Sequence, residues 1–236
     1  MAIALAAAPA AQAGPAPQAD PSAVVDATPI AAPTDILGQL EAANDQLKEF
    51  GITPFLWPTA AVNCSQVPGT PLGIVPAVAG AAAGPTTPGV GDIALPNPLD
   101  PTKPFDLNAV KGGEVFYGFF PAGIVDDSSN KSGMNVGWFN VDTFQGGFVP
   151  MGSLTSTIMA PINAQIDALP VQAFRDVARD ALAPLEDALD ALPQAGARAA
   201  IVETGKGTVL SLVMGSVTHS GGTCYFLPTV GIQDVA

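Results

Sequence analysis

Residues 198–217 read RAAIVETGKGTVLSLVMGSV, two aliphatic runs on either side of the turn Gly205-Lys206-Gly207. Short apolar runs of this kind, separated by a glycine turn, are typical of two strands joined as a β-hairpin. A second turn at Ser220-Gly221-Gly222 leads into another apolar run over residues 223–227, and residues 230–235 continue the pattern. The C-terminal part of the chain therefore predicts consecutive antiparallel strands.

Further strands are predicted upstream, over residues 114–120, 134–141 and 145–151, and the last two are expected to pair as a hairpin. Between residues 67 and 104 many prolines and glycines interrupt the apolar pieces, so this region is expected to supply edge strands at most. Together these segments predict a mainly β protein: an antiparallel β-sandwich-like domain of two packed sheets.

Two segments have helical rather than strand periodicity. Residues 34–51 predict an N-terminal amphipathic helix, with Thr34 or Asp35 as cap and Gly51 as stop. Residues 154–193 predict two or three short helices, because prolines interrupt a long apolar stripe; they form an α-helical insertion in the β domain. Such a stripe ordinarily packs on its own domain. The alternative is a face for an apolar, lipid-like ligand, made by Ile158, Ile162, Ile166, Phe174, Leu182, Leu185 and Leu189.

The N-terminal residues indicate export. Residues 1–13 are apolar and end in Ala11-Gln12-Ala13, which is typical of a signal-peptide cleavage site. No lysine or arginine precedes Lys48, so we interpret residues 1–13 as a signal-peptide remnant; an Ala/Pro-rich tail is the alternative. Residues 14–33 predict a disordered Pro/Ala-rich linker, and residues 34–236 a single β-rich domain. The expected location is secreted, extracellular or in the cell envelope.

Composition narrows the choice of partners. The 236 residues carry a net charge of −13, and only 12% of them are charged. Because such a molecule repels phosphate and its few bases do not cluster, nucleic acid is not expected as a partner. Glycine and proline interrupt every apolar run, so no transmembrane span is expected. Protein or lipid partners remain, and the oligomeric state is open.

Two cysteines, Cys64 and Cys224, are present in the chain. In an exported protein such a lone pair predicts one disulfide between the two ends of the domain, whereas a reducing compartment would leave two free thiols.

Catalytic and metal-binding motifs are weak in this sequence. The single histidine, His219, is next to a glycine turn, where a solvent-exposed side chain is expected, and no serine lies in a G-x-S-x-G elbow. A weak metal candidate consists of Asp126, Ser128 and Asn130, oxygen ligands at alternate positions. A polar hairpin loop explains the same residues, and Lys131 replaces the glycine of a calcium loop. We therefore expect neither an enzyme nor a cofactor.

Three short motifs carry a resemblance. Residues 221–231 read GGTCYFLPTVG, residues 138–141 read WFNV and residues 146–150 read GGFVP. In these regions the chain resembles uncharacterised exported proteins of high-GC actinobacteria. The resemblance implies export and a small β domain, with the helical residues 154–192 as an addition. It implies no activity for any residue.

The sequence thus predicts a secreted or cell-envelope, non-catalytic structural or interaction protein. The alternative is an extracellular carrier that binds an apolar, lipid-like ligand between the helical insertion and the β domain; a hydrolase is less favoured. A co-purifying lipid would favour the carrier, and a solid core would count against it.

Overall fold

The computed structural model describes residues 36–64, 67, 73–97, 100, 102–124, 126, 130–191 and 195–236. The predicted signal-peptide remnant and linker, residues 1–33, lie outside the described residues, as does Ser128 of the metal candidate. The helices are α1 (Ile36–Glu49), α2 (Leu154–Asp167) and α3 (Gln172–Ala191). The strands are β1 (Thr53–Pro54), β2 (Thr59–Ala61), β3 (Val75–Ala83), β4 (Ala94–Leu95), β5 (Phe105–Asp106), β6 (Glu114–Pro121), β7 (Met134–Asn140), β8 (Gln145–Pro150), β9 (Arg198–Glu203), β10 (Gly207–His219) and β11 (Gly222–Val235).

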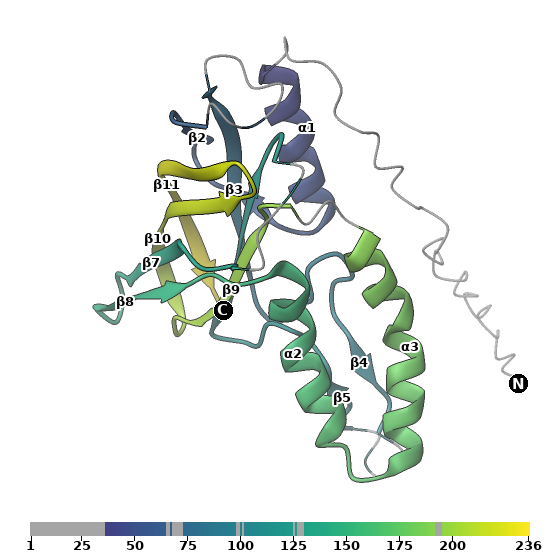
Figure 1. Ribbon diagram of the computed structural model, residues 1–236. Coiled ribbons are helices and arrows are strands. Elements are labelled where there is room, and N and C mark those ends of the chain that lie inside the picture. The colour runs from purple at the N-terminus through teal and green to yellow at the C-terminus, as the bar shows by residue number, and fades with distance from the viewer. Residues whose placement is uncertain are drawn as a thin grey trace, which may run out of the picture.

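Nine of these strands form one antiparallel sheet in the order β8-β7-β10-β11-β2-β3-β6-β9, with β1 paired to β3. The two ends of this order meet, because Gly152 and Ala199 exchange backbone hydrogen bonds of 2.7 and 3.0 Å. The sheet is therefore curled and nearly closed (Figure 1). The separate ribbon β4-β5 has two strands.

The prediction of a mainly β, antiparallel fold is confirmed, but the two packed sheets of a sandwich are not what the described residues form. A single continuous sheet wraps around the core instead. The long strands β10 and β11 bend where their register shifts between Val213 and Gly215, and Gly215 has a φ of 141°. A bulge of this kind increases strand curvature. The strands can thus curl around the core without a break between two layers.

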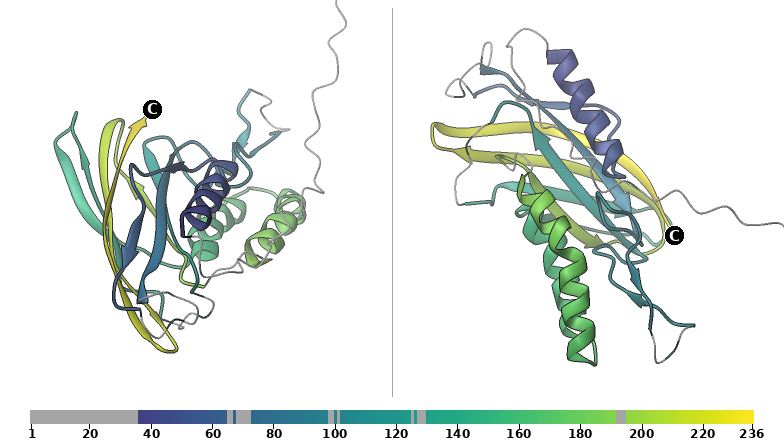
Figure 2. Two further views of the ribbon diagram at one scale, coloured as in Figure 1. Left: turned by 90° about the horizontal axis from the view of Figure 1, so that it is seen from above. Right: turned by 90° about the vertical axis from the view of Figure 1, so that its right-hand side faces the viewer.

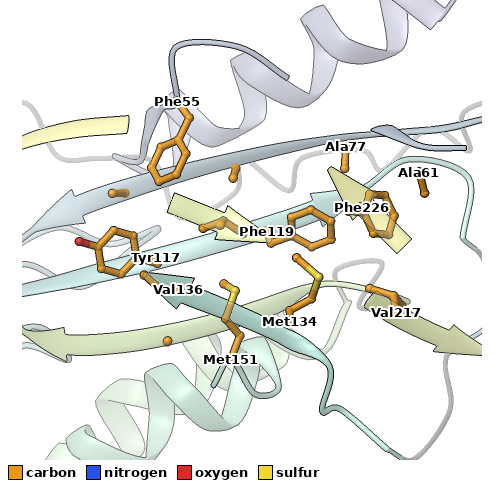
Figure 3. Packing of buried hydrophobic residues seen from close by; sticks show 14 of the residues in the cluster. Phe55, Ala61, Ala77, Tyr117, Phe119, Met134, Val136, Met151, Val217 and Phe226 are labelled. Atoms are coloured by element: carbon orange, nitrogen blue, oxygen red, sulfur yellow. The ribbon is translucent and has the colours of Figure 1, made fainter. Parts of the chain in front are cut away.

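Inward-facing side chains fill the curled sheet. Tyr117 and Phe119 alternate inward along β6 and share this core with Phe226 of β11 and Val217 of β10 (Figure 3). The Phe119 and Phe226 rings lie edge to face with centroids 4.8 Å apart. The Tyr117 hydroxyl and the Ser211 hydroxyl form a buried 2.8 Å hydrogen bond. Aromatic and aliphatic side chains fill most of this interior, and Arg198, Ser211 and Gln233 are among the polar residues buried in the same strands.

The buried phenol of Tyr117 predicts alkaline sensitivity. Burial raises the pKa of Tyr117 from 10.0 to about 12, with the Ser211 hydrogen bond acting in the opposite direction. The unfolded chain therefore releases this proton from pH 10 upward while the folded protein retains it, so stability falls between pH 10 and 12, by about 2–3 kcal/mol. Urea unfolding across this range should show a smaller fall for Tyr117→Phe. Tyr225→Phe, at an exposed site, should behave as wild type; equal falls in all three proteins would contradict the assignment.

A second core lies between the sheet and the helices. The opposite side chains of β6, including Phe116, and Val78 of β3 pack against apolar residues of α1, α2 and α3. All three helices lie on one side of the sheet (Figure 2). The outer surface of β3, β6 and β9 is thereby covered. This arrangement determines which outer surface the helices leave open.

Two predictions about strands are wrong. The turn at Gly205-Lys206-Gly207 does not close a hairpin, since β9 pairs with β6 whereas β10 pairs with β7 and β11. The Asn140 side chain of β7 donates hydrogen bonds to the carbonyls of Thr204 and Lys206. These bonds fix the turn that connects β9, at one end of the sheet order, to β10, which is next to β7. In addition, β3 is an interior strand between β2 and β6 rather than an edge strand.

Candidate functional site

The disulfide is present. Cys64 follows β2, and Cys224 lies in β11 with its Cα 5.1 Å from that of Cys64. Both cysteines are buried in the interior core, and 160 positions separate them in the sequence. The bond therefore ties an early part of the domain to its last strand.

The predicted apolar ligand face packs against the chain's own residues. Its side chains are buried or half-buried within the second core: Ile158, Ile162, Ile166, Phe174, Leu182, Leu185 and Leu189. Phe174 has its ring 6.3 Å from that of Phe105 on β5. Gln165 fixes α2 at its polar side, accepting a 2.6 Å hydrogen bond from Lys111 Nζ and donating a 2.9 Å bond to the Asn108 carbonyl. The stripe is thus placed as an ordinary core.

The candidate metal ligands Asp126 and Asn130 form hydrogen bonds to other residues of the chain. Asn130 Oδ1 accepts hydrogen bonds from the backbone and hydroxyl of Ser132, and Asp126 accepts one from the Ser220 hydroxyl. Within the described part of the chain no three His, Cys, Asp or Glu side chains come close enough to hold an ion.

His219 is buried, which corrects the expected exposed position. It is the last residue of β10 and points inward, and its Nδ1 accepts a 3.1 Å hydrogen bond from the Gly221 backbone. Asp126 Oδ1 lies 3.8 Å from the same nitrogen. Inward and outward side chains alternate along β10 up to the turn, and this alternation places the His219 ring in the interior. The residue type and the neighbouring glycine turn alone did not indicate that His219 is buried.

Large apolar side chains are exposed on the side of the sheet that the helices leave open. Phe139, Leu210 and Ile232 are direct neighbours across β7, β10 and β11. Phe148 on β8 pairs with Gly137, whose other neighbour is Leu212. We call the outward side chains of Phe139, Phe148, Leu210 and Ile232 the apolar face; their exposure ranges from 41% to 69%. Such side chains in cross-strand contact form a continuous surface.

The apolar face contains no charge. The outward positions of β7, β8 and β10 carry only apolar, glycine, asparagine, serine and threonine residues, and Asp234 of β11 lies at the rim. Exposed apolar residues continue along β11 and beside β2: Leu56, Trp57, Val62, Tyr225 and Leu227. Summed over these five residues, Phe144 and the four residues of the apolar face, the exposed area is on the order of 1,000 Å², taking about 200 Å² per large side chain. The largest apolar patch on an ordinary monomer is about 300–600 Å², and larger ones mark interaction sites.

An open groove of about 600 Å³ borders this surface where β8 and β9 diverge. Its lining consists of Trp138, Phe144, Gln145, Gly146, Glu203 and Gly205. Glu203 is the only charged residue in this lining. Gly146 of β8 lies on one side of the groove, and Glu203 and Gly205 lie on the β9 side. The groove is therefore lined by two glycines, two aromatic residues and two polar residues.

Phe144 occupies an unfavourable conformation at this groove. Its φ of 57° lies in the left-handed region, and its side chain is 80% exposed while contacting the Phe139 ring edge to face at 6.4 Å. A left-handed backbone conformation costs roughly 1–2 kcal/mol for most residues. The exposed Phe144 ring also lacks the stabilisation that burial of an apolar side chain provides. Strained residues of this kind cluster at functional sites.

Phe144→Asn is therefore expected to raise the free energy of unfolding by about 0.5–1 kcal/mol, since asparagine tolerates the left-handed region. Urea denaturation of this variant and of Phe144→Ala, which keeps the strain, measures the conformational contribution. A stability loss in Phe144→Asn as large as in Phe144→Ala would show that the ring, not the backbone, determines stability here.

Comparison with known proteins gives no relative: no family model, no curated protein and no solved structure matches the chain. Of the helices in the described ranges, none combines the length and apolar character needed to cross a membrane. The function is therefore inferred from the surfaces of the chain itself.

The exposed apolar face consists of other residues than the helical stripe for which the sequence suggested an apolar ligand. Residues 134–141 were predicted as a strand, and neither of its sides was identified as exposed. β7 does lie inside the sheet, between β8 and β10, but Phe139 faces outward and is exposed. The signal that could have revealed the exposed face lies in β10, where two sets of side chains alternate between the outside and the inside of the sheet. The outward set is Leu210, Leu212 and Met214, and the inward set is Val209, Ser211 and Val213. Apolar residues at both sets of positions left the exposed side undetermined.

Proposed function

We propose that the protein is a secreted or cell-envelope, non-catalytic interaction protein that binds a protein partner through the apolar face. The observation that carries this proposal is the uncharged, exposed cross-strand row Phe139, Leu210 and Ile232 on the open side of the sheet.

The size and chemistry of this surface support the proposal. A specific protein interface buries about 800 Å² on each partner, with aromatic residues enriched and charge depleted at its centre. The apolar face and its continuation along β11 supply an area of that order. The whole chain carries a net charge of −13, so this uncharged region is where a partner meets least electrostatic cost.

Export is supported by the disulfide, because such bonds persist in oxidising compartments. The motif resemblance to exported actinobacterial proteins agrees with this location. The carrier hypothesis has less support, since the helical stripe that would enclose a ligand is occupied by the chain's own side chains. A ligand there would have to displace residues such as Phe105 and Phe174.

Leu210→Lys combined with Ile232→Lys tests the proposal. Two charges in the centre of the apolar face should lower partner affinity at least a hundredfold, because each would be desolvated in the complex. The partner is captured from culture fluid and envelope extract of the producing organism with wild-type protein, then titrated against each variant. Val177→Lys, at an exposed position of α3, is the matched control and should bind as wild type. Equal binding by the double variant would refute this surface as the binding site.

A further inference from the structure

We propose that the seam between β8 and β9 is a second docking element, which accepts an extended, basic segment of a protein partner as an added strand. This inference rests on the proposed function, because β8 also carries part of the apolar face. It names the kind of segment the partner presents: a short strand with lysine or arginine at a position beside Glu203.

Backbone hydrogen bonding shows which groups face the seam. Met151 donates to Met134 on the β7 side, whereas Gly152 donates to Ala199 on the β9 side. Because donors alternate along a strand, the peptide groups of Phe148 and Gly146 point away from β7, into the seam. These are the polar groups that an edge strand offers to an incoming chain.

The same alternation holds on the opposite side. Thr204 donates to the Gly113 carbonyl next to β6, and Ala199 donates to Gly152 across the seam. The peptide groups of Ile201 and Glu203 therefore face the seam as well. Among the described residues, β8 pairs only with β7, and β9 pairs only with β6, apart from the single bridge between Gly152 and Ala199.

Pro150 explains why the ladder stops after one bridge. Continuing the antiparallel register from the Gly152 and Ala199 pair brings Pro150 opposite Ile201 as the next hydrogen-bonded pair. Proline has no N–H, so it cannot donate to the Ile201 carbonyl. The following pair would join Phe148 to Glu203, and the next would join Gly146 to Gly205. Gly146, Glu203 and Gly205 of these pairs line the groove, where the strands diverge instead.

The lining of the groove defines the chemistry of the added segment. Gly146 and Gly205 leave the backbone on both sides accessible, and Trp138 and Phe144 provide apolar contact. Glu203 is the only charged lining residue, and the protein is strongly acidic. A neutral or acidic strand gains no charge complementarity here, whereas lysine or arginine pairs with Glu203 and stacks on the aromatic rings.

The added strand has a defined geometry. Because β8 and β9 run antiparallel to each other, a strand between them is antiparallel to one and parallel to the other. Both kinds of ladder satisfy the peptide groups. Main-chain hydrogen bonds provide affinity in this mode of recognition, and alternate side chains provide specificity.

Three synthetic peptides test the site: acetyl-Thr-Val-Lys-Val-Thr-amide and its counterparts with central alanine or glutamate. Titration into isotope-labelled protein should shift the amide resonances of Gly146, Phe148, Ile201 and Glu203. Affinity should fall in the order lysine, alanine, glutamate, with about fivefold between the extremes at low salt. Glu203→Lys should reverse this order, and being exposed it tests charge without disturbing the core.

Pro150→Val supplies the missing backbone N–H, so β8 and β9 should pair with each other and exclude an added strand. The affinity for the lysine peptide should therefore fall about tenfold. The Leu210→Lys and Ile232→Lys variant should bind the peptide as wild type, so failure of the seam and failure of the apolar face are separately visible. Absence of amide shifts for all three peptides would overturn the proposal. So would an order of affinities that Glu203→Lys leaves unchanged, or unaltered peptide binding by Pro150→Val.

Discussion

Replacing Cys64 and Cys224 by alanine is expected to lower the free energy of unfolding by about 3–5 kcal/mol. The disulfide joins positions 160 residues apart, so its loss returns much conformational freedom to the unfolded chain. Both side chains are buried, and alanine at each removes only one sulfur from the interior core. Urea denaturation at neutral pH measures the loss.

Reduction of the wild-type protein is the control for this prediction. With dithiothreitol present, the wild-type unfolding curve should move toward that of the double alanine variant, because both chains then lack the cross-link. A variant within about 1 kcal/mol of the oxidised wild type would contradict a stabilising role for the bond.

Phe119→Ala is expected to cost about 3–5 kcal/mol, the range for removal of a fully buried phenyl group. Phe119 has no exposed surface, and its ring lies edge to face with that of Phe226 at 4.8 Å. It points into the curled sheet from β6, where neighbouring strands leave little room for collapse around the void (Figure 3). Urea denaturation of the purified variant gives the value.

Phe148→Ala is the matched control, since it also removes a phenyl ring from a strand. Phe148 is 69% exposed on the apolar face, so its loss should change stability by less than about 1 kcal/mol. Similar losses in both variants would mean that the curled sheet does not enclose the main core.

The sequence predicts the strands best where branched and aromatic residues are dense. The bounds of β6, β7 and β8 agree closely with the predicted runs, since aliphatic and aromatic side chains suit a pleated, half-buried surface. The interior position of β3 was not predicted because its residues are mostly alanine and glycine, which have low strand propensity. Close packing explains their small size: a Cβ on Gly80 would lie 2.7 Å from the Ile52 side chain and from the Thr53 carbonyl oxygen.

Strand partners were harder to predict than strands. The turn at residues 205–207 looked like a hairpin because consecutive strands usually pair. The sheet instead closes on itself, which places β9 and β10 on different sides of the β7–β8 pair. Closure depends on contacts between distant segments, such as Gly152 with Ala199, and local patterns contain no information on them.

The candidate binding surface could be predicted only in part. The disulfide follows from cysteine count and expected compartment, and the helical stripe was correctly identified as an apolar face of helices. Which apolar surfaces become covered depends on tertiary packing. The helices cover β3, β6 and β9, so their own stripe is buried while Phe139, Leu210 and Ile232 remain exposed.

Native mass spectrometry of the protein isolated from the organism that produces it, with folded and denatured samples compared, shows whether this protein acts by binding a protein partner. We expect an additional protein mass in the folded sample that is absent after denaturation and absent for the Leu210→Lys and Ile232→Lys variant. A bare monomer, or an added mass of lipid size that the variant retains, would contradict it.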